Sequence, residues 1–348
     1  MSSLTSRSFE LRGATFADAS ILITGGTGSF GRSMARYLLS RHQPRRLVIF
    51  SRDEQKQEVM ARQLQAEFPQ EASRLRFFIG DVRDASRLEL AMRDVSMVIH
   101  AAALKIIPTA EYNPFECILT NVHGAENVVK AALRTGVGKV IALSTDKAAS
   151  PINLYGASKL AADKIMVAAN NLSGATGPRF SVVRYGNVIG SRGSVVPLFQ
   201  DLISRGAKSL PITDPRMTRF WITLDQGVAF VTSSMEMMAG GELFVPKIPS
   251  MRITDLARPM APNLDHEIVG IRPGEKIHEV MITEDDARST LELDDRFVIC
   301  PPIIGWSSTH LAAYHPRPVA EGFQYNSNGN KEWIDDAAVM ALLGLVPA

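Results

Sequence analysis

The chain has 348 residues, of which 45% are hydrophobic and 21% charged, and its formal net charge is +2. This composition is that of a folded globular protein, and it provides no bulk charge for binding nucleic acid or a membrane surface. Cys117 and Cys300 are too few for a disulfide framework and lack metal-ligand spacing, so we interpret them as packing residues and expect no metal site. Because no signal core and no apolar run of ~18 residues occurs, we expect a cytoplasmic protein.

Short apolar runs alternate with segments of helical pattern in the first half of the chain. The runs cover residues 20–24, 46–50, 75–79, 97–101, 139–143 and 180–184. Separations suited to crossover helices predict an α/β fold with a doubly wound parallel sheet of the Rossmann type. We therefore assign residues 15–186 to a dinucleotide-binding domain, to which the chain returns at about 224–247 through a helix over 225–238.

The second half is rich in proline and predicts a smaller lobe made of short elements. We assign residues 187–223 and 248–300 to this substrate-binding lobe, and residues 301–348 to a C-terminal extension packed on the body. His100 and His278 have no partners at metal or triad spacing and are expected to be structural. Methionine and aromatic side chains at helical or strand spacing are interpreted as core: Met217, Phe220, Trp221, Met235, Met237 and Met238.

A glycine-rich loop follows the first predicted strand and leads into a helix. Its sequence T-G-G-T-G-S-F-G places Gly25, Gly28 and Gly31 at the spacing G-x-x-G-x-x-G. Glycines permit a tight turn and let a pyrophosphate approach the N–H groups at the helix N-terminus. The loop residues Thr27, Ser29 and Phe30 are assigned to the same dinucleotide site.

The end of the second strand bears on the choice between NAD and NADP. An NAD enzyme usually offers a carboxylate there, whereas Ser51 and Arg52 suit a ribose 2′-phosphate, so we favour NADP. The alternative is a solvated loop in which Asp53 binds the ribose. Further cofactor contacts are assigned to residues at or near strand ends: Asp81, Val82, Ala101, Lys105, Leu143, Ser144 and Val188.

The segment S-T-D-K-A-A-S-P-I-N-L-Y-G-A-S-K carries the groups with catalytic potential. Thr145, Asp146 and Lys147 follow the strand at 139–143 and fall at its carboxyl end, where open α/β sheets bind ligands. Tyr155 and Lys159 share a helix face, and we expect the lysine charge to lower the phenol's pKa. Taken alone, Asp146 and Lys147 could equally be a surface ion pair.

These motifs resemble the extended short-chain dehydrogenase/reductase superfamily. Longer strings are similar to the inverting UDP-N-acetylglucosamine 4,6-dehydratases, which open the pseudaminic acid pathway. The strings are A-A-A-L-K, E-Y-N-P-F-E, S-T-D-K-A-A, R-Y-G-N-V-I-G-S-R-G-S-V-V-P, T-R-F-W-I-T and R-P-G-E-K. The resemblance extends from about residue 20 to the C-terminus, with the tail only loosely matched.

The resemblance implies a role for each catalytic residue. Tyr155 takes the proton of the sugar C4 hydroxyl, Thr145 hydrogen-bonds the C4 oxygen, and Lys159 orients the nicotinamide ribose. Asp146 protonates the leaving C6 hydroxyl and Lys147 takes the C5 proton. For this, Asp146 must be protonated, and we expect burial and nearby positive charge to lower the pKa of Lys147.

The resemblance also implies a UDP-sugar site. Three arginines suit pyrophosphate and ribose oxygens: Arg192, Arg219 and Arg272. Glu275 is assigned to the uridine ribose, Asn187 and Ser194 to sugar or phosphate, and the backbone of Gly193 and Val195 to uracil. Lys105 is expected to contact both cofactor and sugar.

Three alternatives stay open at this point. A retaining 4,6-dehydratase or a 4-epimerase would act on the same nucleotide sugar, although the pair Asp146 and Lys147 favours the inverting enzyme. A non-catalytic NADP-sensing module usually lacks the intact pair formed by Tyr155 and Lys159. The superfamily resemblance further implies a homo-oligomer, either a dimer or a hexamer, with helices around 121–135 and 158–170 as dimer faces.

Overall fold

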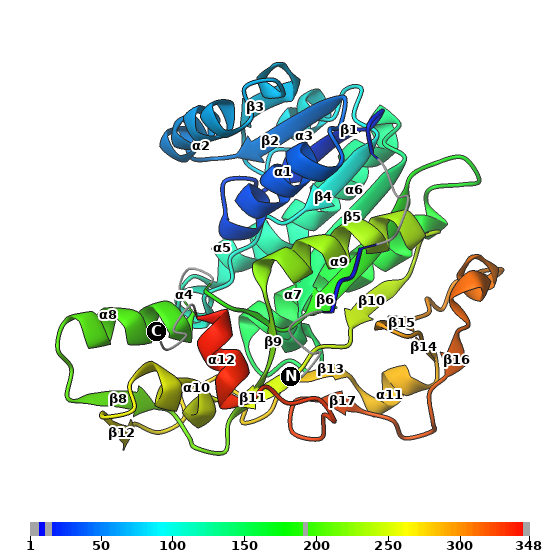
Figure 1. Ribbon diagram of the computed structural model, residues 1–348. Helices are drawn as coiled ribbons and strands as arrows, with labels where there is room; N and C mark the ends of the chain where they lie inside the picture. The colour runs from blue at the N-terminus through cyan, green and yellow to red at the C-terminus, as the bar shows by residue number, and fades with distance from the viewer. Residues whose placement is uncertain (1–6, 11–15, 191–193, 344–348) are drawn as a thin grey trace.

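A ten-stranded sheet forms the centre of the molecule, in the computed structural model that describes residues 7–10, 16–190 and 194–343 (Figure 1). Its strand order is β16-β14-β15-β10-β6-β5-β4-β1-β2-β3. Seven strands from β3 to β10 are parallel, and β15 pairs antiparallel with β10. The parallel strands are β1 (Ser20–Thr24), β2 (Arg46–Ser51), β3 (Leu75–Ile79), β4 (Met97–His100), β5 (Lys139–Thr145), β6 (Arg179–Tyr185) and β10 (Leu243–Pro246).

Helices cover both faces of this sheet. On one face α1 packs against α9, and on the other α6 lies between α3 and α7. The helices of this part are α1 (Ser29–Arg41), α2 (Glu54–Glu67), α3 (Ala85–Ala91), α4 (Ile107–Tyr112), α5 (Pro114–Ile118), α6 (Gly124–Thr135), α7 (Leu154–Ala168) and α9 (Leu224–Met237). The doubly wound Rossmann-type fold predicted from the sequence is confirmed.

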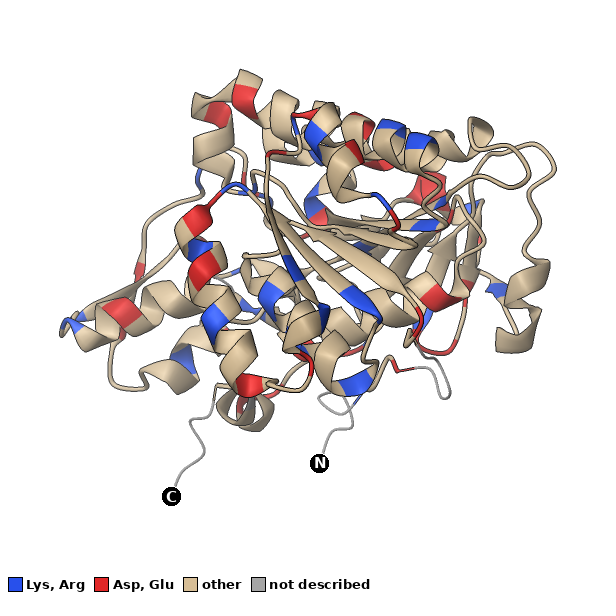
Figure 2. Ribbon diagram, turned by 90° about the horizontal axis from the view of Figure 1, so that it is seen from above, with Lys and Arg blue, Asp and Glu red and all other residues tan. Residues whose placement is uncertain are grey.

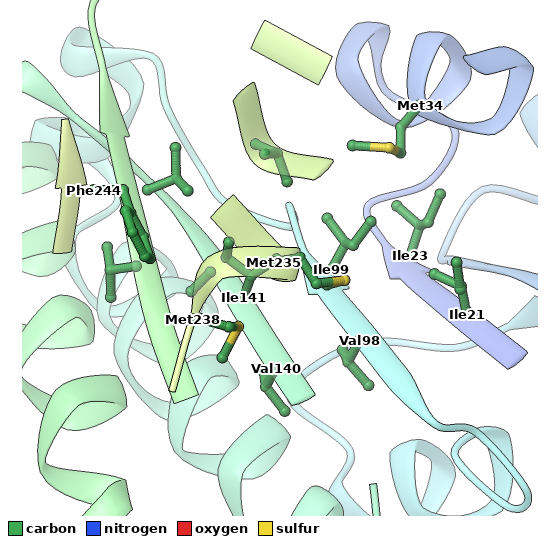
Figure 3. Close-up of a cluster of buried hydrophobic side chains, with 14 of the residues drawn as sticks. Ile21, Ile23, Met34, Val98, Ile99, Val140, Ile141, Met235, Met238 and Phe244 are labelled. Carbon is green, nitrogen blue, oxygen red and sulfur yellow. The ribbon is translucent and has the colours of Figure 1, made fainter. Parts of the chain in front are cut away.

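The six predicted strands are present because their side chains are apolar toward both helical layers. Figure 3 shows the core between the sheet and α1 and α9, where Ile23, Ile99 and Ile141 from neighbouring strands lie near Met34 and Met235. The structure also extends β5 and β6 beyond their predicted ends, to Thr145 and Tyr185. As a result Thr145 belongs to the strand rather than to the loop after it.

A second cluster of buried apolar residues lies in a smaller lobe beside the carboxyl ends of the strands. Its sheets pair β9 with both β7 and β11, and β8 with β12. Its elements are β7 (Asn187–Val188), α8 (Val195–Ser204), β8 (Ser209–Ile212), β9 (Thr218–Ile222), β11 (Ser250–Arg252), α10 (Ile253–Met260) and β12 (Asp265–Ile268). The methionine and aromatic residues predicted to be core are all buried.

The predicted boundaries between the lobes differ from the structure at one place. The strands β14 (Thr290–Glu292) and β15 (Arg296–Ile299) lie within the range assigned to the small lobe, yet they extend the large sheet. Their antiparallel hairpin pairs with β10 and so covers an edge that would otherwise expose unpaired backbone groups. Two further elements of this region are β13 (Val280–Ile282) and α11 (Glu284–Ala287).

The last part of the chain packs on both lobes. β16 (Arg317–Pro318) pairs with β14, β17 (Tyr325–Asn326) pairs with β13, and α12 (Asp336–Leu342) packs against α10. The helix α12 begins at Asp336, because Asp335 caps it by accepting a hydrogen bond from the Ala338 N–H at 2.8 Å. Before it, the Trp333 indole N–H donates to the Asn330 carbonyl at 2.7 Å, and the Ile334 backbone N–H donates to the Ser250 carbonyl at 3.0 Å.

Charged residues of both signs alternate over the helices and loops around the sheet, as Figure 2 shows. The mixture of positive and negative residues agrees with the small formal net charge of +2. Within the described residues, no helix combines the length and the apolar character needed to cross a membrane.

Candidate active site

The glycine loop after β1 has the form needed to hold a phosphate group. Gly25 has a φ of +64°, a left-handed conformation, and a Cβ there would lie 2.8 Å from the Cα of Ala102. A Cβ on Gly31 would overlap the backbone of Gly26, so the loop and α1 pack directly. Gly28 is the N-cap of α1 and provides no side-chain cap, and no acidic residue occupies the first turn. The N–H groups of α1 are therefore available to an anion such as a pyrophosphate.

The residues after β2 fit a phosphorylated ribose better than a free one. The Ser51 hydroxyl accepts a hydrogen bond from Gln57 at 3.0 Å and keeps its own proton for donation. The Arg52 guanidinium is half exposed and lies 3.5 Å from Asp81. Asp53, the alternative ribose ligand, instead caps α2 and binds Lys56 at 2.5 Å. Its carboxylate is thus already engaged.

Thr24 organises the backbone that faces the glycine loop. Its hydroxyl accepts from the N–H groups of Ala101 and Ala102 at 3.2 and 3.3 Å and bonds to His100 at 2.8 Å. Burial lowers the pKa of His100 to about 3, so this histidine is neutral and structural, as predicted. Val82 is buried beneath α6, where a Cβ on Gly124 would press against it.

The carboxyl end of β5 brings together the predicted acid and base. Thr145 donates to Asp146 at 2.9 Å, and the Lys147 ammonium donates to the same carboxylate oxygen at 3.1 Å. Lys147 also lies 3.3 Å from Oε1 of Glu279 and 3.5 Å from Oδ1 of Asn187. Lys147 thus donates hydrogen bonds to Asp146 and Asn187 and forms a second ion pair with Glu279.

Lys147 differs from its predicted electrostatic state. Burial alone disfavours its ammonium form, but Asp146 and Glu279 outweigh burial and raise the pKa of Lys147. The expectation of a lowered pKa was wrong for the protein without ligands, because the sequence did not reveal the second carboxylate. Burial raises the pKa of Asp146, which agrees with the predicted protonated acid.

Tyr155 and Lys159 are both buried on the inner face of α7. Burial raises the pKa of Tyr155 to about 12, and Lys147 rather than Lys159 is the leading cation that opposes the shift. The prediction that Lys159 lowers this pKa is therefore not met. Burial lowers the pKa of Lys159, against the attraction of Asp163. Asp163 is itself held by Ser144 at 2.7 Å, which ties α7 to β5.

Asn121 was not identified from the sequence, although it holds the site together. It lies in a π-helical turn, η2 (Leu119–His123), between α5 and α6. Its amide bonds the Leu104 N–H at 2.8 Å, the Leu104 carbonyl at 2.9 Å and the Ser158 hydroxyl at 2.9 Å. These bonds join the loop after β4 to the helix that carries Tyr155. The single asparagine gave no local signal, because its partners lie in other segments.

The predicted sugar residues divide into several groups. Asn187 contacts Lys147, and Ser194 at the start of α8 has a buried hydroxyl without a hydrogen-bond partner among the described residues. Lys105, Arg272 and Glu275 lie on loops and Val195 begins α8, with Arg272 half exposed and 3.7 Å from Glu275. Arg192 and Gly193 lie outside the described residues.

Arg219, predicted to bind substrate, has a guanidinium that the protein backbone engages. Its guanidinium is buried and donates to the carbonyls of Thr218, Ile277 and Lys276 at 2.8 to 3.0 Å. Because its guanidinium N–H groups donate to backbone carbonyls, Arg219 fixes the segment before β13. It also lies 3.7 Å from Glu279. Glu279 was not among the predicted site residues. Its carboxylate lies between Arg219 and Lys147 and forms an ion pair with each.

The family described as polysaccharide biosynthesis protein matches residues 21–301. The chain belongs to this family. An inverting UDP-N-acetylglucosamine 4,6-dehydratase of Campylobacter jejuni subsp. jejuni serotype O:2 is 54% identical, over 94% of this chain and 98% of that protein. A UDP-glucose 4-epimerase of Rickettsia akari is 44% identical, over 78% of this chain and 80% of that protein.

One solved structure is similar to this chain in both sequence and fold. The X-ray structure of Pen from Bacillus thuringiensis has a TM-score of 0.85 and 36% identity, and the match covers 96% of this chain and 100% of that chain. The resemblance to the inverting 4,6-dehydratases that the motifs indicated is confirmed.

Proposed function

We propose that the protein catalyses the NADP-dependent 4,6-dehydration of UDP-N-acetylglucosamine with inversion at C5. The product is a UDP-2-acetamido-2,6-dideoxy-4-keto-hexose of arabino configuration, and the reaction is a lyase step that opens pseudaminic acid synthesis. The observation that carries this proposal is the ion pair of the buried Asp146 with the partly exposed Lys147 at the end of β5, beside Tyr155. The 54% identical dehydratase supports the same substrate class.

The fit of the cofactor depends on the glycine loop and the end of β2. The N–H groups of α1 would hold its pyrophosphate, while Ser51 and Arg52 would hold the 2′-phosphate. A nicotinamide dinucleotide held there would supply a reversible hydride acceptor. Lys159, buried one helical turn after Tyr155, would bind the nicotinamide ribose.

The protein's own residues account for the proton transfers. Tyr155 takes the proton of the C4 hydroxyl, with Thr145 hydrogen-bonded to the C4 oxygen. A C4 ketone makes the C5 proton acidic. Lys147 would remove it as the neutral amine, formed when its ammonium passes a proton to a neighbouring carboxylate, 3.1 or 3.3 Å away. Asp146 gives its proton to the C6 hydroxyl, which leaves as water. Oδ2 of Asp146 is buried and has no partner among the described residues, so it can accept or donate to a sugar hydroxyl.

Two related activities compete with this assignment. A 4-epimerase is favoured by the 44% identical UDP-glucose 4-epimerase, and it needs no elimination from C6. A retaining dehydratase would give the other C5 configuration. Proton NMR of the product formed from UDP-N-acetylglucosamine separates all three outcomes. A methyl signal at C6 with inverted C5 supports the proposal, whereas a product that keeps its C6 hydroxyl refutes it.

The preference for NADP has a separate test. Titration of the apo-protein should give tighter binding of NADP than of NAD, because Arg52 can pair with the 2′-phosphate. Arg52→Asp should weaken NADP binding by about tenfold or more and leave NAD binding nearly unchanged. Arg62→Asp on the exposed side of α2, where Arg62 pairs with Glu58, is the matched control. Equal losses in both variants, or tighter NAD binding by the parent, would contradict the preference.

We also propose a cytoplasmic homo-oligomer, a dimer or a hexamer, that uses the faces of α6 and α7. Next to α7, the helices α4 and α5 carry Tyr112 and Phe115 with 87% and 81% of their surfaces exposed. Aromatic side chains of this exposure are typical of protein interfaces. Light scattering after size-exclusion chromatography measures the mass, and Phe115→Asp should lower it. A monomeric parent would contradict the proposal.

A further inference from the structure

The carboxylate of Glu279 faces the same ammonium as Asp146. Glu279 precedes β13, far from β5 in the sequence, and both carboxyl groups are buried, with 2% and 0% of their surfaces exposed. Lys147 lies between them, 3.1 Å from Asp146 and 3.3 Å from Glu279. Each carboxyl group also has one buried oxygen without a partner among the described residues.

The charged groups around this cluster favour ionisation of Glu279 over Asp146. Arg219 from β9 lies 3.7 Å from Glu279, and Lys276 of the preceding loop adds a further positive charge. Burial opposes its ionisation, but Lys147, Arg219 and Lys276 together lower the pKa of Glu279. For Asp146 burial is the larger effect, and the charge of Glu279 raises the pKa further.

The remaining titratable neighbours do not change this order. From α7, Tyr155 faces Thr145 and is neutral because burial raises its pKa to about 12. Lys159 on the same helix has Asp163 as its charged partner. Two carboxyl groups that share one ammonium in a buried site cannot both ionise easily, so the one with fewer cations keeps a proton.

The backbone of Glu279 is fixed by the C-terminal extension. Its N–H donates to the Ser327 hydroxyl at 2.9 Å, and its carbonyl accepts from the Ser327 N–H at 2.8 Å. The same hydroxyl bonds Thr218 beside Arg219. Glu279 is therefore held on a rigid support, which is what a residue that orients another group requires.

We propose that Glu279 is a positioning residue that holds Lys147 against Asp146 and keeps a proton on Asp146, the form needed to protonate the leaving hydroxyl. This role rests on the proposed dehydration. Glu279 acts through Lys147 and Asp146 and controls the pH range of elimination, while oxidation at C4 depends on Tyr155 and Lys159. The C-terminal extension therefore contributes to this role, because its Ser327 holds Glu279 in place.

The test compares pH profiles of dehydration for the parent, Glu279→Gln and Glu279→Asp. Without the charge of Glu279, the pKa values of both Asp146 and Lys147 fall, so both limbs of the profile should move to lower pH by about one unit or more. Glu279→Asp keeps a carboxylate and should restore most of the parental profile. Glu292→Gln, which removes an ion pair with Lys247 away from the site, should leave the profile unchanged.

A second measurement does not depend on the variant of Glu279 folding. Difference infrared spectra of the parent and Asp146→Asn near neutral pH should show the carbonyl band of a protonated carboxylic acid in the parent. The band should be absent from Glu279→Gln if that variant is folded. Its absence from the parent, or an unshifted pH profile in Glu279→Gln, overturns the role of Glu279. A parent that forms no 4-keto product contradicts the dehydratase instead, and leaves the infrared result to decide this inference.

Discussion

Replacement of Lys147 by methionine should destabilise the protein by an amount that grows with pH. Methionine keeps most of the length of the side chain but leaves Glu279 without its nearest cation, 3.3 Å away in the parent. Removal of one partner from a buried ion pair costs about 3 to 5 kcal/mol. Arg219 stays 3.7 Å from Glu279, and Asp146 already favours its protonated form. We therefore expect a loss of stability at the lower end of this range, about 3 kcal/mol at pH 8.

The pH dependence follows from the change at Glu279. In the parent its pKa is lowered, so its ionised form stabilises the fold above the ordinary pKa of a glutamate. In Lys147→Met one of the positive charges that oppose the effect of burial on Glu279 is lost, so the pKa of Glu279 rises. The variant then loses stability as the pH increases through this raised pKa. The cost should therefore shrink toward about 1 kcal/mol near pH 5, where Glu279 takes up a proton.

Thermal unfolding at pH 5 and pH 8 measures this difference. An unfolding entropy of about 2.1 cal/mol/K per residue, over 348 residues, converts 3 kcal/mol into a Tm lower by about 4 °C. Lys130→Met is the control, because its pair with Glu126 on α6 is exposed and is worth about 0.5 kcal/mol. A Tm loss that is the same at both pH values, or no larger than that of the control, would refute the reasoning.

Three further substitutions test other parts of the site. Tyr155→Phe should abolish the reduced-nicotinamide absorbance that appears on mixing the oxidised holoenzyme with substrate, and normal reduction would identify another base. Asn121→Ala removes the side-chain hydrogen bonds to Leu104 and Ser158 and should cost about 2 to 3 kcal/mol in thermal unfolding, with slower turnover because α7 loses its link to Leu104; unchanged stability would contradict that link. Gly31→Ala should cost about 3 kcal/mol and prevent NADP binding in a fluorescence titration, because its Cβ overlaps the Gly26 backbone; normal binding would show that the loop can adjust.

The sequence by itself determined the Rossmann half of the molecule. Apolar runs buried on both faces have a local signature, and the loop from Gly25 to Gly31 lies between a strand and a helix in the chain as well as in space. Thr145, Asp146 and Lys147 could be placed at the sheet edge for the same reason, since a residue that ends a parallel strand lies at its carboxyl edge.

Only the tertiary structure decided how these groups are charged and supported. Glu279, Asn121 and Arg219 act through partners that are distant in the chain, so no spacing or periodicity could assign them. The membership of β14 and β15 in the large sheet was likewise hidden, because a short hairpin has the same local pattern whichever sheet it joins. A pKa depends on the groups within a few ångströms, and the fold chooses those neighbours. The sequence could therefore name the acid and the base at the end of β5, but it could not show that a second buried carboxylate, held by Ser327, faces them.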